Sequence, residues 1–150
     1  MNNIYSKNKK SLFDYEILET LEAGLLLSGS QTKSIKTNSI KLSGSFVSIH
    51  HDAAWLTNIH IPRYKYSNLE NYNPDADIKL LLNKKEIAYL RGKIQEKGLT
   101  IVPISLYNKN RKIKLEIGIA RGKKLYDKRR ILREKSQKME AAQILKSKTF

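Results

Sequence analysis

The chain has 150 residues, of which 29 are Lys or Arg and 14 are Asp or Glu, and its formal net charge is +15. It contains no cysteine, which excludes disulfides and thiolate metal sites. No apolar run approaches the ~20 residues of a membrane helix, and no signal peptide is visible, so a cytoplasmic location is expected. The excess positive charge favours a polyanionic partner, and nucleic acid is favoured over an acidic membrane.

The basic residues gather at the two ends of the chain. Residues 1–12 hold three lysines and no acid, and residues 121–150 hold eleven basic and three acidic residues. This distribution predicts a globular body (13–120) between a basic N-terminal arm (1–12) and a basic C-terminal tail (121–150). A solvated helix face is the plainer explanation of such a run, but the imbalance favours a nucleic-acid arm. The tail has no sustained apolar stripe, so it is predicted to be largely disordered until it binds a partner.

The first half of the body is predicted to be mainly strands. Residues 15–27 are apolar and rich in strand formers, and Gly24 is predicted to form a bulge. Residues 30–37 fit a short helix. Two further strands, at 46–50 and 55–61, predict a hairpin with a four-residue loop.

The second half begins with a polar loop at residues 62–78. A helix is predicted from about residue 84 to 97, with Asn83 as N-cap, Glu86 completing a capping box and Gly98 ending the helix.

Another hairpin follows, from residue 99 to about 119, with apolar and polar residues alternating from Lys112 onward. Pro103 is expected at an edge or a bulge. These elements predict a mainly β fold: a closed six-stranded barrel of the oligonucleotide-binding (OB) type, with one or two helices and basic, partly disordered tails.

Residues suited to catalysis or metal binding are few. His50 and His60 could face each other across the first hairpin, but no third ligand is apparent. Glu70, Asp75 and Asp77 lie together in one loop, which is a weak indication of a metal-dependent nuclease. We therefore expect no catalytic site, no metal site and no cofactor, and predict that the chain is not an enzyme.

Tyrosines alternate with basic residues at 63–66 and again at 124–129, and Phe13 follows two lysines. Aromatic rings can stack on bases while Lys and Arg neutralise phosphates. For Tyr64 and Tyr66 the alternative is that they cover the barrel, and the sequence leaves both open. Composition alone also leaves a ribosomal protein open.

Several short motifs occur in order along almost the whole chain. They are Asn8-Lys9-Lys10, Asp14-Tyr15, Glu22-Ala23-Gly24, Lys33-Ser34-Ile35, Lys79-Leu80-Leu81-Leu82, Gln95-Glu96-Lys97-Gly98-Leu99-Thr100, and the run from Ala120-Arg121-Gly122-Lys123-Lys124 to Leu125-Tyr126-Asp127-Lys128-Arg129. In these motifs and their spacing the chain resembles the SsrA-binding protein (SmpB) family.

The resemblance implies an OB-type barrel with a helix across it. It implies a protein that binds transfer-messenger RNA (tmRNA, SsrA) and delivers it to stalled ribosomes for trans-translation, ribosome rescue and peptide tagging. The expected partners are this RNA and the ribosome, at its decoding centre and messenger channel. The tail would become helical in that channel. Apart from the resemblance, the sequence carries no oligomer signal, so a monomer is expected.

The resemblance also suggests site residues. Asn8, Glu22 and Leu81 match the family's RNA-binding face, although Leu81 could instead belong to the core and Glu22 could brace a lysine. The predicted RNA-binding residues are Asn8, Lys9, Lys10, Phe13, Glu22, Lys33, Leu81, Lys123 and Lys124. The predicted ribosome-contacting residues of the tail are Tyr126, Asp127, Lys128, Arg129, Arg133 and Lys135.

A few positions depart from the family pattern. Gln31 stands where the family usually has Glu, and Lys36 stands where it has Arg. Asn38 replaces a usual Gly and is expected to keep a left-handed backbone there. Ala76 and Ile78 replace basic residues, which weakens any prediction of RNA contacts by the loop before Lys79.

Overall fold

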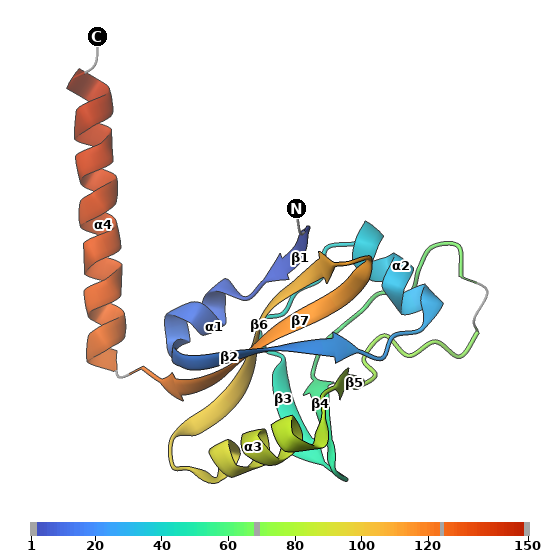
Figure 1. Cartoon of the computed structure of the whole chain (residues 1–150). Helices are drawn as coiled ribbons and strands as arrows, with labels where there is room; N and C mark the ends of the chain where they lie inside the picture. The colour runs from blue at the N-terminus through green and yellow to red at the C-terminus, as the bar shows by residue number, and fades with distance from the viewer. Residues whose placement is uncertain (1–2, 68–69, 124, 149–150) are drawn as a thin grey trace.

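A computed structural model describes residues 3–67, 70–123 and 125–148, with the backbone alone for residues 125–127 and 140–148 (Figure 1). The described strands are β1 (Ile4–Lys7), β2 (Tyr15–Leu25), β3 (Phe46–His50), β4 (Ala53–Thr57), β5 (Ile78–Leu81), β6 (Leu99–Lys109) and β7 (Lys112–Gly122). The described helices are α1 (Lys9–Asp14), α2 (Gly29–Thr37), α3 (Lys84–Gln95) and α4 (Leu125–Lys148).

The strands form one antiparallel sheet in the order β1-β6-β7-β2-β5-β4-β3. The mainly β prediction is therefore confirmed. The sheet curls so that β3 lies against β6, but no backbone ladder joins these two strands within the described ranges. Closure into a barrel thus stays a prediction.

The prediction of six strands was wrong, because the described residues form seven. One strand of the seven, β1, lies in the segment predicted to be a partly disordered arm. It pairs with β6, with Ile4 opposite Tyr107 and Lys7 opposite Ser105. Tyr5 packs against the core and anchors this strand. The high lysine content of the arm hid the short apolar pair at its start.

The first hairpin has a two-residue turn, not the predicted four-residue loop. His51 and Asp52 have φ values of 53° and 56°, as in a type I′ turn, so β4 begins already at Ala53. Asn110 and Arg111, at 52° and 66°, make the same kind of turn between β6 and β7. Neither turn contains the glycine that usually signals this conformation in a sequence.

Two irregularities were predicted in the sheet, at Pro103 and at Gly24, and only the first is present. The register of β6 against β7 shifts between Pro103 and Ser105, as predicted for the proline. Gly24 is not a bulge, because the shift in β2 falls between Ile17 and Glu19.

Helix α3 begins as the sequence predicts, and α2 begins at Gly29, one residue before its predicted start. In α3 the Asn83 side chain accepts a hydrogen bond from the Glu86 backbone N–H at 2.8 Å, and the Glu86 carboxylate accepts from the Asn83 N–H at 3.1 Å. Ser28 and Gln31 form the same capping box on α2, so Gln31 fills the capping role that a Glu could also fill. Asn38 at the end of α2 is extended (φ −112°), and the prediction of a left-handed backbone was wrong.

The core lies between the curled sheet and helices α2 and α3. Its fully buried members come from nearly every element and include Ile35, Leu56, Leu80, Leu90, Leu106, Leu115 and Ile117. Ile78 is also buried, 2% exposed, opposite Leu56. Ile78 stands where the family pattern has a basic residue. Its burial explains the difference, because an unpaired basic side chain in the core would be costly.

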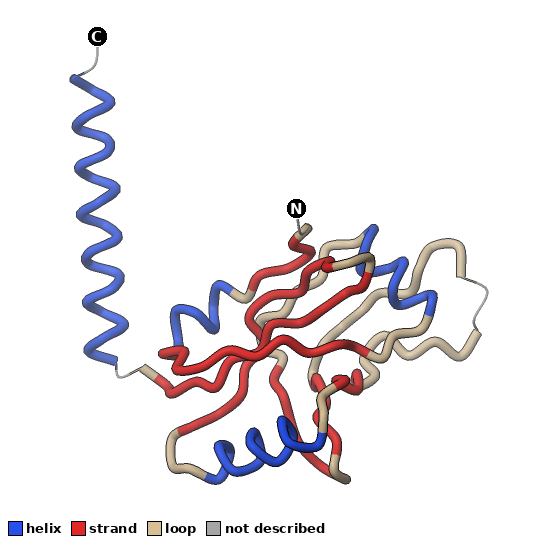
Figure 2. Tube along the Cα trace, in the orientation of Figure 1, coloured by secondary structure: helices blue, strands red, loops and turns tan. Residues whose placement is uncertain are grey.

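The tail is a helix, α4, which projects away from the body (Figures 1 and 2). This differs from the predicted disorder. Residues 125–148 contain no Gly or Pro and are rich in strong helix formers, which favours a helix even without an apolar stripe. At its base, the Lys128 ammonium lies 3.3 Å from the Asp14 carboxylate. No helix in the described part of the chain is long and apolar enough to cross a membrane.

Gly118 on β7 tests how tightly the core is packed. A Cβ placed there would lie 2.7 Å from Ile104 Cδ1 and 3.1 Å from Ile17 Cγ2. Gly118→Ala is therefore expected to lower the free energy of unfolding by about 1–3 kcal/mol through overpacking. Urea unfolding measures this change. Gly92→Ala is the control: it meets nothing within 4 Å on the exposed side of α3 and should raise stability by up to ~1 kcal/mol.

Candidate nucleic-acid interface

The outer face of the sheet carries two of the predicted RNA-binding residues. Strand register places Glu22 and Gly24 of β2 on the same face as Leu81 of β5 and Lys114 of β7. Leu81 is 52% exposed, so the alternative that it belongs to the core was wrong. An exposed leucine in a sheet of a strongly basic protein is suited to contact with an RNA base or ribose.

Leu81 borders a shallow pocket of ≈ 280 Å³, here called the Leu81 groove. It is lined by Gly24, Leu25, Leu27, Thr32, Leu81, Arg111, Lys112, Ile113 and Lys114. The lining residues include three cations and no acid. Apolar surface next to cations is what a nucleotide requires, since its base and sugar contact the former and its phosphate the latter.

Gly24 explains why the groove is open. A Cβ at this position would lie 3.2 Å from Leu81 Cβ, closer than ordinary contact. Any larger residue would therefore push against Leu81 and fill the floor of the groove. The glycine serves close strand packing rather than a bulge.

Glu22 is held by two neighbours on β6. The Tyr107 hydroxyl donates a hydrogen bond to its carboxylate, and Lys109 Nζ lies 3.3 Å from it. The hydrogen bond from Tyr107 holds the pKa of Glu22 below its usual range. Desolvation of the carboxylate opposes this shift, and the positive charges of Lys109 and Lys114 add to it. Burial, together with Glu22, raises the pKa of Tyr107, which keeps its hydroxyl a donor. Glu22 therefore braces a lysine, one of the two roles predicted for it.

Asn8 is buried, 1% exposed, and its polar atoms are used inside the chain. Its amide donates to the Pro103 carbonyl at 2.9 Å, and its Oδ1 accepts from the Ser11 N–H at 3.2 Å as the N-cap of α1. The side chain thus fixes α1 on β6. It thereby also positions the exposed Lys9 and Lys10 that follow it in the sequence.

Those two lysines border a second pocket of ≈ 330 Å³, the N-terminal lysine pocket. Its lining residues are Ser6, Lys7, Lys9, Lys10, Ser39, Ile40, Lys41, Leu42 and Ser43. The fold brings Lys41 to the arm from a distant part of the sequence, so sequence reasoning missed it. Phe13, further along α1, is only half-buried.

The other predicted residues that the structure describes do not line the Leu81 groove. Lys33 is exposed on α2, and Lys123 Nζ donates to the Leu12 carbonyl at 3.2 Å. In α4, Arg129, Arg133 and Lys135 are exposed. Lys124 and the side chains of Tyr126 and Asp127 are outside the described residues.

Sequence reasoning also missed Arg111, Lys112 and Lys114 as a group. Lys112 and Lys114 were predicted only as part of a polar strand face, and Arg111 was given no role. The one sequence feature that could have indicated a basic site is that these three residues lie within four positions of one another, at the tip of a hairpin. They lie beside Leu81 because β2 pairs with β7 on one side and with β5 on the other, and these strands are far apart in the sequence.

His50 and His60 have different neighbours in the structure. His50 stacks on Trp55, with ring centroids 5.5 Å apart, whereas His60 Nδ1 lies 2.8 Å from Asp75 Oδ1. The two histidines do not face each other as predicted, because β4 ends at Thr57, before His60. Within the described ranges no three His, Cys, Asp or Glu side chains gather as metal ligands would.

Comparison with known proteins identifies the family. The family described as SmpB protein matches residues 5–147. The SsrA-binding protein of Aquifex aeolicus (strain VF5) is 48% identical over 144 residues, which cover 95% of this chain and 92% of that protein. The SsrA-binding protein of Thermosynechococcus vestitus is 44% identical over 146 residues, 97% of this chain and 96% of that protein.

Solved structures agree with the sequences. A chain in the structure "tmRNA-SmpB: a journey to the center of the bacterial ribosome" superposes with a TM-score of 0.66 at 40% identity, covering 80% of this chain and 85% of that one. The motif resemblance is thereby confirmed: the chain belongs to the SmpB family.

Proposed function

We propose that the protein binds tmRNA and delivers it to stalled ribosomes in the cytoplasm, for trans-translation, ribosome rescue and peptide tagging. Its membership of the family over almost its whole length carries this proposal, because the relatives are SsrA-binding proteins. It acts as an RNA-binding protein and not as an enzyme, and it works as a monomer without a cofactor.

The body supplies the RNA affinity in this proposal, working as an OB-type barrel. The Leu81 groove offers an apolar floor and cationic walls, and the N-terminal lysine pocket adds phosphate neutralisation nearby. Asn8 contributes by holding α1, while Glu22 keeps Lys109 and Tyr107 in place. Lys33, Lys123, Lys124 and Phe13 extend this RNA-binding set.

The tail supplies the ribosome contacts. Arg129, Arg133 and Lys135 are exposed on a helix that leaves the body, which suits binding in a narrow channel lined by RNA phosphates. Tyr126, Asp127 and Lys128 complete the proposed contact set near the base of that helix.

A competition gel shift tests the function. The purified protein is titrated against tmRNA from the same organism, with excess transfer RNA as competitor. Binding that survives the competitor is the expected result, because a specific groove discriminates where charge alone does not. Binding that the competitor removes would leave a generic basic RNA binder and would contradict the proposal.

A further inference from the structure

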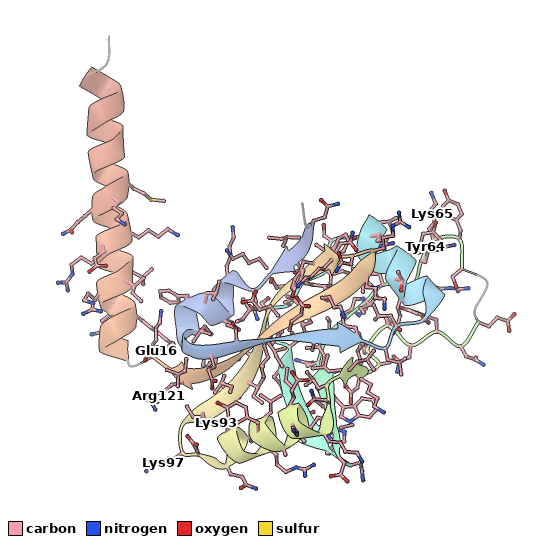
Figure 3. All side chains as sticks on the ribbon, viewed as in Figure 1. Glu16, Tyr64, Lys65, Lys93, Lys97 and Arg121 are labelled. Carbon is pink, nitrogen blue, oxygen red and sulfur yellow. The ribbon has the colours of Figure 1, made fainter. Side chains whose placement is uncertain are left out.

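A cluster of tyrosines and cations lies outside the lining of the Leu81 groove, where residues 62–67 pass beside α2. It consists of Lys33, Arg63, Tyr64, Lys65 and Tyr66, and is here called the tyrosine cluster. Figure 3 shows Tyr64 and Lys65 at the end of the body away from α4. Three of its members, Lys33, Tyr64 and Tyr66, line a pocket of ≈ 500 Å³ together with Gly29, Ser30 and Ser67.

The Tyr66 ring is presented to solvent, and the Tyr64 ring beside it is half-buried. Tyr66 is 72% exposed, so covering the sheet does not explain it. The Tyr64 and Tyr66 rings meet edge to face, with centroids 5.5 Å apart. Lys33 Nζ lies 5.6 Å from the centre of the Tyr64 ring, and Lys65 Nζ lies 5.6 Å from the centre of the Tyr66 ring. Each of the two rings is thus paired with its own ammonium group.

The backbone beneath the cluster is firmly held. The Ser67 N–H donates to the Tyr64 carbonyl at 2.9 Å and the Arg63 guanidinium donates to the Ser67 carbonyl at 2.8 Å, which closes a turn. The buried Ser34 of α2 donates its hydroxyl to the Pro62 carbonyl. Such anchoring lowers the entropy cost of ordering the rings when a ligand binds.

We propose that the tyrosine cluster is a second RNA-binding surface, which stacks an unpaired nucleotide on Tyr66 and neutralises its phosphates with Lys33, Arg63 and Lys65. Three cations and no acidic residue in the cluster select an anionic ligand, and the exposed Tyr66 ring selects one with a flat π-face. An unpaired nucleotide has both properties. The inference rests on the proposed function for its RNA partner, and the nucleotide belongs either to tmRNA or to ribosomal RNA.

The test compares Tyr66→Leu with the wild-type full-length chain. Two affinities are measured. The first is that of the protein for tmRNA in the presence of excess transfer RNA, and the second is that of the preformed protein–tmRNA complex for ribosomes. Loss of a stacked base should weaken one of the two affinities by about fivefold or more. The arm that weakens identifies the source of the nucleotide. Tyr66→Phe keeps the ring and should retain wild-type affinity within about twofold.

Tyr89→Leu is the matched control. Tyr89 is also exposed and has Lys93 Nζ 5.5 Å from its ring centre, but its hydroxyl donates to Glu19. An acidic neighbour disfavours RNA, so this variant should bind as the wild type does.

Unchanged affinity of Tyr66→Leu in both arms, with wild-type binding intact, would overturn this inference alone. An equal loss in Tyr66→Phe would also overturn it, because stacking does not need the hydroxyl. A third result would also overturn it: photo-cross-linkers placed at residues 63–67 that react with a ribosomal protein and not with RNA. Failure of the wild type to prefer tmRNA over transfer RNA would instead overturn the proposed function.

Discussion

Leu81→Glu is expected to weaken binding to tmRNA by at least about tenfold, which corresponds to ~1.4 kcal/mol. The change removes an exposed apolar side chain from the floor of the Leu81 groove and places a carboxylate where phosphates approach Arg111, Lys112 and Lys114. The folded chain should lose little stability, since Leu81 is half exposed and such surface substitutions usually change stability by only about 0.5 kcal/mol. Fluorescence anisotropy at constant ionic strength measures the dissociation constant, and thermal unfolding checks the fold.

Leu18→Glu controls for the added charge. Leu18 is 44% exposed on β2, the strand that also carries Gly24, but it lies outside the lining of the Leu81 groove. The same substitution there lowers the net charge equally and should change the affinity less than about twofold. Equal losses in both variants would mean that total charge alone governs binding and that Leu81 has no special role.

The sequence predicted elements whose signals are local. The capping box of α3 and the alternation of β7 are written in consecutive residues, and both appear in the structure as expected. The tight turns were missed because His51–Asp52 and Asn110–Arg111 adopt a left-handed backbone without glycine. Neighbouring strands enforce that conformation, and a residue-by-residue reading has no access to it.

The candidate site shows the same division. Leu81 and Glu22 could be selected from motifs, but their neighbours could not. Lys114 and Leu81 flank Gly24 on opposite sides only because β7 and β5 both pair with β2. Asn8 was predicted as an RNA contact, yet its side chain is buried against Pro103, which only the folded structure places there. A motif therefore marks that a residue matters without saying whether it touches the ligand.

Removal of residues 127–150 is expected to abolish peptide tagging while leaving the affinity for tmRNA within about threefold of wild type. The deletion removes most of α4, with eight basic and three acidic residues. It removes no residue that lines the Leu81 groove or the N-terminal lysine pocket. The lost charge should appear mainly as weaker non-specific binding and a shallower dependence of affinity on salt. Competition with transfer RNA removes that non-specific part, and a tagging assay with stalled ribosomes measures the second activity.

Asp14→Asn separates the helix itself from its attachment to the body. It breaks the 3.3 Å contact with Lys128 and keeps the whole tail. An ion pair of this kind contributes only about 0.2–1 kcal/mol, so this variant should retain most tagging. If the deletion removed RNA affinity and tagging to the same extent, the tail would be part of the RNA-binding surface, and the division between an RNA-binding body and a ribosome-binding tail would be wrong. If Asp14→Asn alone abolished tagging, the direction in which α4 leaves the body would matter more than its charge.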